Sequence, residues 1–441
     1  TPQLVTVLSD AQTEHYAQPL DIETVPPVLD LRQVVVKRKA DAGVDQADDD
    51  AMNFVGMLFD YILNDRNLAI PMKALIGRLQ IPIVKLAIID KSFFEKSSHP
   101  ARQLLNALSS AGIGWSSAAE LKRDALYNKI ESIVLRVMNG FQDNLDIFTE
   151  LLDELRSFTK QDERKRKLVE QRVKDTETGK ARTVAAKETV QTLINHKASG
   201  LRLPPAVGRF ISDTWSKVLV YACVTEGTSS ALWECQAETL DDLLWCLQPL
   251  ESLQEVDKRD AKIDPLLAGL DAGMQHLQTA DNERGEIIAL IRKELNRISA
   301  SDRAYLEDDA TPTLDDSYEA LDEIILTAPH ERMPAETVSD ADPQFVAKID
   351  ALSEGVWVEL VNDDGDRIRC KLAAIIQPGD RYVFVNRRGM KVLEKSKTGL
   401  AAALRDKNLT ILEEAQVFDR ALQAVIGNLR TMQRTPQPAA E

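Results

Sequence analysis

Histidine is the first residue type to consider for chemistry, because imidazole titrates near neutral pH without help from its surroundings. His99 stands directly before Pro100, at the expected start of a helix, and Arg102 follows three residues later. One hypothesis is therefore an uncharacterised enzyme with a site near His99 and Arg102, in a cleft between helices. The simpler interpretation is that His99 caps this helix and packs locally, and we expect that role.

Recognisable catalytic and metal-binding motifs do not occur in this sequence. The five histidines are scattered, without H-E-x-x-H or H-x-x-H spacing, and there is no G-x-S-x-G, G-x-x-x-x-G-K-[ST] or G-x-G-x-x-G pattern. The four cysteines form no C-x-x-C pair, which favours free thiols in a reducing compartment. We therefore predict no catalytic residue, no metal site and no cofactor, in a protein that is not an enzyme.

A cationic segment spans residues 156–187 of this acidic chain. The cations at its centre are Arg164, Lys165, Arg166 and Lys167. One interpretation is a solvated helix with i,i+4 ion pairs, such as Glu163 with Lys167 and Glu170 with Lys174. The other is an interaction surface for nucleic acid or for an acidic partner. Few aromatic residues interleave with these cations, which argues against stacking on single strands.

A second group of cations lies near the C-terminus, where strands are expected. Candidate ligands for an anion such as a nucleotide are Arg381, Arg387, Arg388 and Lys391. The alternative interpretation is that outward-facing charge protects a small sheet from pairing at its edges.

Most elements that could position these residues are predicted to be helices. Phe54, Leu58, Tyr61 and Ile62 fall on one face of a helix for which Asp50 is the expected N-cap. Residues 118–198 predict two long helices, and the second carries the cationic segment. We therefore expect a helical domain over residues 51–299 with two long helices.

Segments with few large apolar residues flank this domain. Residues 1–50 predict a disordered acidic linker, because they cannot bury enough surface to offset their ordering entropy. Residues 300–342 are rich in Asp and Glu and contain Arg303 and Arg332 as their basic residues, which predicts a second acidic linker. Residues 435–441 are expected to form a disordered tail.

The sequence period changes to two after residue 355. Ile368, Cys370 and Leu372 alternate with charged residues, and neighbouring runs alternate in the same way between turns that contain Gly, Asn and Asp. Residues 343–434 therefore predict a small β-barrel domain with flanking helices. The expected fold class is mainly α, with a multi-helix body followed by a small antiparallel β-barrel and a C-terminal helix.

Composition limits the classes of partner. The formal net charge is −16, so the chain as a whole repels nucleic acid and anionic lipid, and either would need a local basic patch. No apolar run approaches the roughly 18 residues of a transmembrane helix, so we expect no membrane contact and a cytoplasmic location. The chain begins at Thr1 and not at Met, which we interpret as the C-terminal part of a longer protein.

Two stretches resemble a known family. The first comprises residues 58–65 (LFDYILND), 78–82 (RLQIP), 90–94 (DKSFF) and 99–106 (HPARQLLN), and the second comprises residues 355–360 (GVWVEL) and 382–389 (YVFVNRRG). They are similar to a proteobacterial family of unknown function, whose members are large, acidic, helical proteins. The resemblance spans roughly residues 50–430 and implies no established activity.

The C-terminal module also resembles the PilZ domain, which in many bacteria senses cyclic di-GMP through R-x-x-x-R and D-x-S-x-x-G motifs. Gly379 matches the last glycine of the second motif, whereas Ala374 and Ile376 stand where its Asp and Ser belong. The resemblance therefore implies a PilZ-like fold, with Gly379 as the binding residue that carries over, and weak or absent binding of cyclic di-GMP.

These observations predict a non-enzymatic regulatory or scaffolding protein that has a protein partner. Its PilZ-like module would be linked to cyclic di-GMP signalling without the usual binding motif. The alternatives are a nucleic-acid-binding protein that uses the basic 156–187 helix, and an enzyme with a site near His99.

Overall fold

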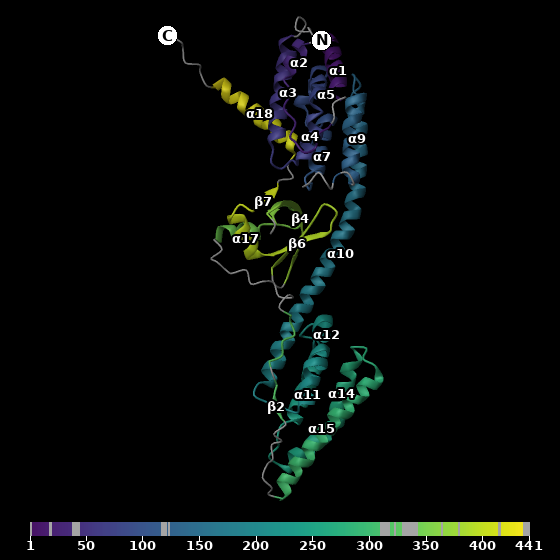
Figure 1. Ribbon diagram of the computed structural model, residues 1–441, viewed down its shortest axis with the longest axis vertical. Coiled ribbons are helices and arrows are strands. Elements are labelled where there is room, and N and C mark those ends of the chain that lie inside the picture. Colours follow the sequence, from purple (N-terminus) through teal and green to yellow (C-terminus); the bar gives the residue numbers. More distant parts are fainter. Residues whose placement is uncertain are drawn as a thin grey trace, which may run out of the picture. The chain divides into compact units, whose positions relative to one another are not determined.

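The computed structural model describes residues 2–16, 20–37, 45–115, 121, 124–308, 318–321, 323–328, 343–362, 365–377, 380–412 and 416–434. The chain is mainly α, with a multi-helix body followed by a five-stranded antiparallel sheet and a last helix (Figure 1). It divides into two compact units. The first unit consists of Thr1–Asp175, Thr337–Ile376 and Asp380–Glu441, and the second of Thr176–Glu336 and Gln377–Gly379.

The first unit contains most of the helices. They are α1 (Pro2–Tyr16), α2 (Leu31–Lys37), α3 (Gln46–Asn64), α4 (Ile70–Gly77), α5 (Gln80–Ile89), α6 (Ser92–Glu95), α7 (Pro100–Ala111), α9 (Ala125–Gly140), the first part of α10 (Asp146–Ala198), and α18 (Val417–Arg434). In α4 and α5 nearly every residue is buried, because these short helices are apolar on all sides and form the centre of the bundle.

Residues 1–50, expected as a disordered acidic linker, instead hold α1, α2 and the start of α3. Leu4, Leu8 and Val35 are buried in the helical core, where α1 packs against α5 and α9. Few apolar residues suffice here because they lie on one face of each helix. The first turn of α3 is capped by Asp45, whose side chain accepts from the Asp48 amide, and not by the expected Asp50. Residues 38–44 lie outside the described residues.

The second unit has a separate core. Its elements are the rest of α10, β1 (Arg202–Leu203), α11 (Pro205–Phe210), the π-helical turn η2 (Ile211–Trp215), α12 (Ser216–Glu226), α13 (Ala231–Cys246), α14 (Leu253–Gln275), α15 (Asp281–Asp308) and β2 (Glu319–Ala320). The buried residues of this core run from Val190 to Ile324. The helical domain expected over 51–299 is therefore divided within α10.

The acidic segment 300–342 is partly structured. α15 continues to Asp308, β2 pairs with β1 in antiparallel fashion, and Ile324 is buried in the core of the second unit. These elements differ from the expected linker because they pack against α10 and α11, which the local composition does not reveal. Residues 309–317, 322 and 329–342 lie outside the described part of the chain, as does the expected tail 435–441.

The sheet has the strand order β6-β5-β4-β3-β7. Its strands are β3 (Trp357–Val361), β4 (Arg367–Ile376), β5 (Arg381–Val385), β6 (Lys391–Ser396) and β7 (Leu409–Leu412), and α16 (Pro343–Asp350) and α17 (Lys397–Arg405) accompany them. The alternation predicted from sequence is confirmed, since Cys370, Leu372 and Phe384 are buried in a small core of their own. Among the described residues β6 and β7 do not pair, so the sheet is open where a closed barrel was expected. α17 packs against both of these edge strands.

The last helix, α18, is not part of the sheet module that was expected over 343–434. Phe418, Ala421 and Leu422 are buried in the helical core, where α18 packs against α3 and α7. In Figure 1 this yellow helix lies beside the purple N-terminal helices. The two ends of the described chain thus share one core.

Candidate functional site

The turn between β5 and β6 places Arg387 against the helices of the first unit. The Asn386 side chain holds this turn, because its Oδ1 accepts from the amides of Arg388 (2.9 Å) and Met390 (3.1 Å). Arg387 is only 9% exposed, whereas Arg388 is exposed. Two adjacent arginines that look equivalent in the sequence therefore have opposite environments.

Three groups contact the Arg387 guanidinium. Its Nη1 donates to Asp124 Oδ2 (2.7 Å) and its Nη2 to Asp162 Oδ2 (3.1 Å). The guanidinium carbon also lies 5.4 Å from the centre of the Trp115 ring, which is a cation–π arrangement. Burial lowers the pKa of Arg387, and the two carboxylates act in the opposite direction. Because arginine remains charged in proteins, this is a buried ion cluster.

Asp124 joins this cluster to the helical body. Its Oδ1 caps α9 by accepting from the amides of Leu126 (2.8 Å) and Tyr127 (3.3 Å). Its Oδ2 accepts from Trp115 Nε1 (3.1 Å) as well as from Arg387. The same carboxylate therefore fixes the start of a core helix and the tip of a β-turn.

One face of α10 follows the sheet. Lys371 on β4 donates to both Glu170 oxygens (2.7 and 2.8 Å), and Lys174 donates to Glu354 (2.7 Å). Gly389 has φ +82°, and a Cβ there would lie 3.0 Å from the Arg166 carbonyl oxygen. Glycine is favoured at this position for two reasons, the positive φ of its backbone and the close approach of the helix.

The face of the sheet that carries Lys371 also contacts the loops of the helical body. Arg369 donates to the carbonyl oxygens of Arg66 (2.9 Å) and Asn67 (2.8 Å). The Trp357 ring covers Gly114 so closely that any Cβ there would meet it at 2.3 Å. Sequence reasoning missed these contacts, and Gly114 was the one signal that a large ring needed space.

The expected anion-binding set is not assembled in one place. Arg381 lies at the start of β5, where its Nε is 3.2 Å from Glu394, and Lys391 pairs with the same carboxylate at 2.8 Å. Arg387 follows the other end of β5 and faces the helical body. Gly379 lies outside the described residues.

The central cations of the basic segment also separate. Arg166 is half-buried on the side of the sheet and lies 3.7 Å from Glu170. Arg164, Lys165 and Lys167 are exposed. The helix thus uses one of these four cations internally and presents the other three to solvent.

His99 has the structural role expected from its position. Its Nδ1 accepts from the Ala101 amide (3.1 Å), and its Nε2 lies 3.4 Å from Asp90 Oδ2. Burial lowers the pKa of His99, although Asp90 opposes this shift. Arg102 donates to Asp419 of α18. The interpretation of His99 as a helix cap is confirmed.

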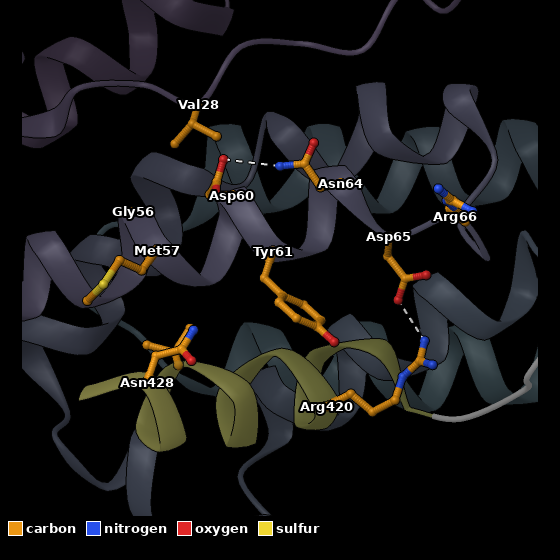
Figure 2. Close-up of a pocket in the computed structure, with 11 residues that line it drawn as sticks. Val28, Gly56, Met57, Asp60, Tyr61, Asn64, Asp65, Arg66, Arg420 and Asn428 are labelled. Carbon is orange, nitrogen blue, oxygen red and sulfur yellow. Dashed lines mark hydrogen bonds and ion pairs between the residues drawn. The ribbon is translucent and has the colours of Figure 1, made fainter. Parts of the chain in front are cut away.

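A pocket of about 760 Å³ lies between α3 and α18. Figure 2 shows Met57 and Tyr61 at its α3 side, with the Asp65–Arg420 ion pair (2.6 Å) at one end. Tyr61, expected on the buried face of α3, is instead 40% exposed and lines this pocket. The lining suits a group with an apolar body and a hydrogen-bonding end.

Three models of one protein family match this chain in sequence order. They are described as "Protein of unknown function (DUF1631)", with the 2nd domain at residues 1–144, the third domain at 176–292 and the C-terminal tudor domain at 344–412, and together they cover well over half of the chain. The chain belongs to this family. The expected resemblance to a family of unknown function is thereby confirmed, and the sheet module corresponds to the tudor domain.

The match to the third domain begins at residue 176, where the structure divides into its two units. No curated protein and no solved structure matches the chain. The described helices contain no stretch that is both long and apolar enough to cross a membrane. Nor do the described residues gather three or more side chains suited to a metal ion.

Proposed function

We propose that this chain is a non-enzymatic scaffolding or regulatory protein that binds another protein. In this proposal the tudor-type sheet is a fixed part of the first unit and not a receptor for cyclic di-GMP. The observation that carries the proposal is the engagement of Arg387 by Asp124, Asp162 and Trp115. A guanidinium that is buried and already paired with two carboxylates is not free to grip a phosphate in the bidentate fashion.

The aromatic residues of the tudor match support the same conclusion. Tudor-type sheets that hold methylated cations would need a cage of exposed rings. Among the described residues of this module Trp357, Tyr382 and Phe384 are buried, and Phe345 is half-buried. The sheet therefore uses its rings for packing, and its family description supports a role in protein interaction.

Calorimetry with the full chain tests the ligand part of the proposal. We expect no saturable heat for cyclic di-GMP, with GMP as the control, because Arg381, Arg387 and Lys391 are already paired with carboxylates. A saturable signal at micromolar or lower concentration for cyclic di-GMP alone would overturn this part.

Capture of partners from the native cell tests the scaffolding part. The baits are the wild-type chain, Arg387→Ala and the matched control Arg388→Ala, compared by quantitative mass spectrometry. We expect at least one protein to be retained by wild type and Arg388→Ala and lost with Arg387→Ala, since only Arg387→Ala removes a contact between the sheet and α10. A set of captured proteins that is the same for all three baits would contradict a role for the docked sheet.

Nucleic-acid binding through the basic helix is the second candidate. It is favoured by the exposure of Arg164, Lys165 and Lys167. It predicts an affinity for duplex DNA or RNA that falls steeply with salt. Binding that is absent at low salt would exclude it.

A further inference from the structure

The side of α10 that faces away from the sheet carries an exposed basic face. We define this face as Lys160, Arg164, Lys167 and Leu168, with Lys165 at its margin. Lys160, Arg164 and Leu168 follow one another at i,i+4 spacing, and Lys167 lies one turn from Arg164 and two turns from Lys160, so the four side chains share one side of the helix. The contacts with the sheet come from Asp162, Arg166 and Glu170, which lie on the other side.

These cations lack the ion pairs that the sequence would allow. Glu163 is expected to pair with Lys167, but the structure places it 3.9 Å from Arg166. Glu170 binds Lys371, so docking of the sheet withdraws a carboxylate from the helix. Lys174 binds Glu354 of the sheet module and not Glu170. Among the described residues no ion pair reaches Lys160, Arg164, Lys165 or Lys167, although acidic residues outnumber basic ones by 70 to 54 in the whole chain.

An apolar residue lies within this charged surface. Leu168 is 67% exposed, a value matched among large apolar residues of the described chain only by Ile325. A single exposed leucine is ordinary, but one surrounded by unpaired cations has the arrangement of a protein interface, where an apolar anchor is enclosed by a polar rim. A nucleic acid backbone would make no use of such a residue, and the net charge of −16 opposes the approach of a long polyanion.

We propose that the basic face of α10 binds an acidic protein segment that carries one large apolar side chain. This inference rests on the proposed scaffolding function and names the chemistry of the partner. Carboxylates of the segment pair with Lys160, Arg164 and Lys167, and its apolar side chain covers Leu168. The affinity should decrease with salt, because the ion pairs form at an exposed surface.

Fluorescence anisotropy with the full chain tests this proposal. The probe is a labelled helical peptide with glutamates on one face around a central phenylalanine, and the reference peptides replace that phenylalanine by alanine. There are two test variants. The first is a triple variant that combines Lys160→Glu, Arg164→Glu and Lys167→Glu, and the second is Leu168→Ala. The matched control is Lys217→Glu, Lys258→Glu, Lys293→Glu, which makes the same change in net charge at exposed positions of the second unit.

We expect the dissociation constant of the probe to rise about tenfold with the triple variant on α10 and roughly fivefold with Leu168→Ala, and by less than about threefold with the control triple. The alanine peptide should be insensitive to Leu168→Ala. Circular dichroism should show unchanged helix content in all variants, because the replaced residues are exposed.

Four results would overturn the proposal. The first is that the probe does not bind wild type at low salt, and the second is that the control triple variant weakens probe binding as much as the triple variant on α10. The third is that a short duplex DNA binds more tightly than the probe, with no effect of Leu168→Ala. The fourth is that wild type self-associates and the triple variant on α10 abolishes this. The third result would assign the face to nucleic acid, and the fourth would assign it to a second copy of the chain. None of the four depends on cyclic di-GMP or on Arg387, so failure of this proposal can be told apart from failure of the proposed function.

Discussion

At the scale of single residues, Arg387 and Arg388 show that two adjacent side chains of the same type can differ in burial and in contacts. Both stand in the same turn, yet Arg387 is buried against two aspartates and Arg388 is exposed. Breaking a buried charge pair leaves carboxylates without their partner, which costs far more than removing an exposed charge. The pair of residues therefore offers an internal comparison.

We expect Arg387→Ala to lower the free energy of unfolding by about 2 kcal/mol, because Asp124 and Asp162 lose their counter-charge. Arg388→Ala should change it by less than about 0.5 kcal/mol. Urea denaturation followed by circular dichroism measures both. Equal effects of the two substitutions would show that the cluster around Arg387 does not hold the sheet.

Gly389→Ala tests the close approach of the turn to α10. The residue combines a positive φ with a backbone oxygen 3.0 Å from any Cβ, so we expect a cost of about 2–3 kcal/mol. Gly365→Ala is the control, because Gly365 has φ +86° but no neighbour near its Cβ, and its cost should be about 1 kcal/mol. Equal costs would mean that the turn does not touch the helix in solution.

The pH dependence of stability should report on His99. Its pKa in the folded protein is lowered, chiefly by burial, so the unfolded chain binds a proton more readily than the folded one. The contribution of this residue is therefore complete above its unfolded pKa of about 6.5 and is lost as the pH falls below that value. His99→Asn keeps a capping side chain and should flatten the loss of stability between about pH 7 and pH 5.

Urea denaturation across this pH range measures the effect. The exposed His196→Asn serves as the control and should leave the pH profile unchanged. A steeper acid loss in His99→Asn than in wild type would contradict the assignment of a buried neutral imidazole.

At the scale of elements, α18 is the piece that local sequence assigns to the wrong neighbour. It follows the sheet in the chain but completes the core of the N-terminal helices. Arg102 and Asn106 of α7 both donate to Asp419, and the Asn106 side chain accepts from the Phe418 amide (3.1 Å). Polar contacts thus fix the start of α18, and apolar packing follows along its first half.

Phe418→Ala should destabilise the first unit by about 3–5 kcal/mol, since Phe418 is fully buried and packs edge-to-face on Phe93 (ring centres 5.5 Å apart). The matched control is Gln423→Ala on the exposed face of the same helix, for which we expect a change within about 0.5 kcal/mol. Thermal unfolding of the full chain compares the two. A small effect of Phe418→Ala would mean that α18 does not belong to the helical core.

At the scale of the whole molecule, the second unit consists almost entirely of one continuous segment, Thr176–Glu336, whereas the first unit does not. The buried core of the second unit uses residues between Val190 and Ile324, whereas the first unit joins both ends of the chain. The start of the family's third domain at residue 176 falls at the same boundary. The second unit therefore forms its core from residues of one segment of the chain.

A fragment of residues 176–336 should consequently fold alone. We expect a helical circular dichroism spectrum and a cooperative thermal transition, because the residues of its buried core all lie within the fragment. A fragment of residues 337–441 is the comparison, and in it α18 should lose its helical signal for want of α3 and α7. A non-cooperative transition in the first fragment would contradict the division.

Part of this architecture follows from the sequence alone. Helical periodicity predicted the amphipathic helices of the body, and period-two alternation predicted the strands around Cys370 and Leu372. The turn residues and the capping role of His99 were also predictable, because each depends on neighbours within a few positions. Local rules decide local structure.

Only the tertiary structure decided which charged side chains form contacts within the protein and which remain exposed to solvent. Asp162, Arg166 and Glu170 looked like members of a solvated helix, and their contacts with the sheet turn and Lys371 come from residues some two hundred positions away. The same holds for α1 and α18, whose apolar faces are too small to order alone and are stabilised by a core assembled from both chain ends. Burial depends on what packs against a residue, and no local pattern contains that information.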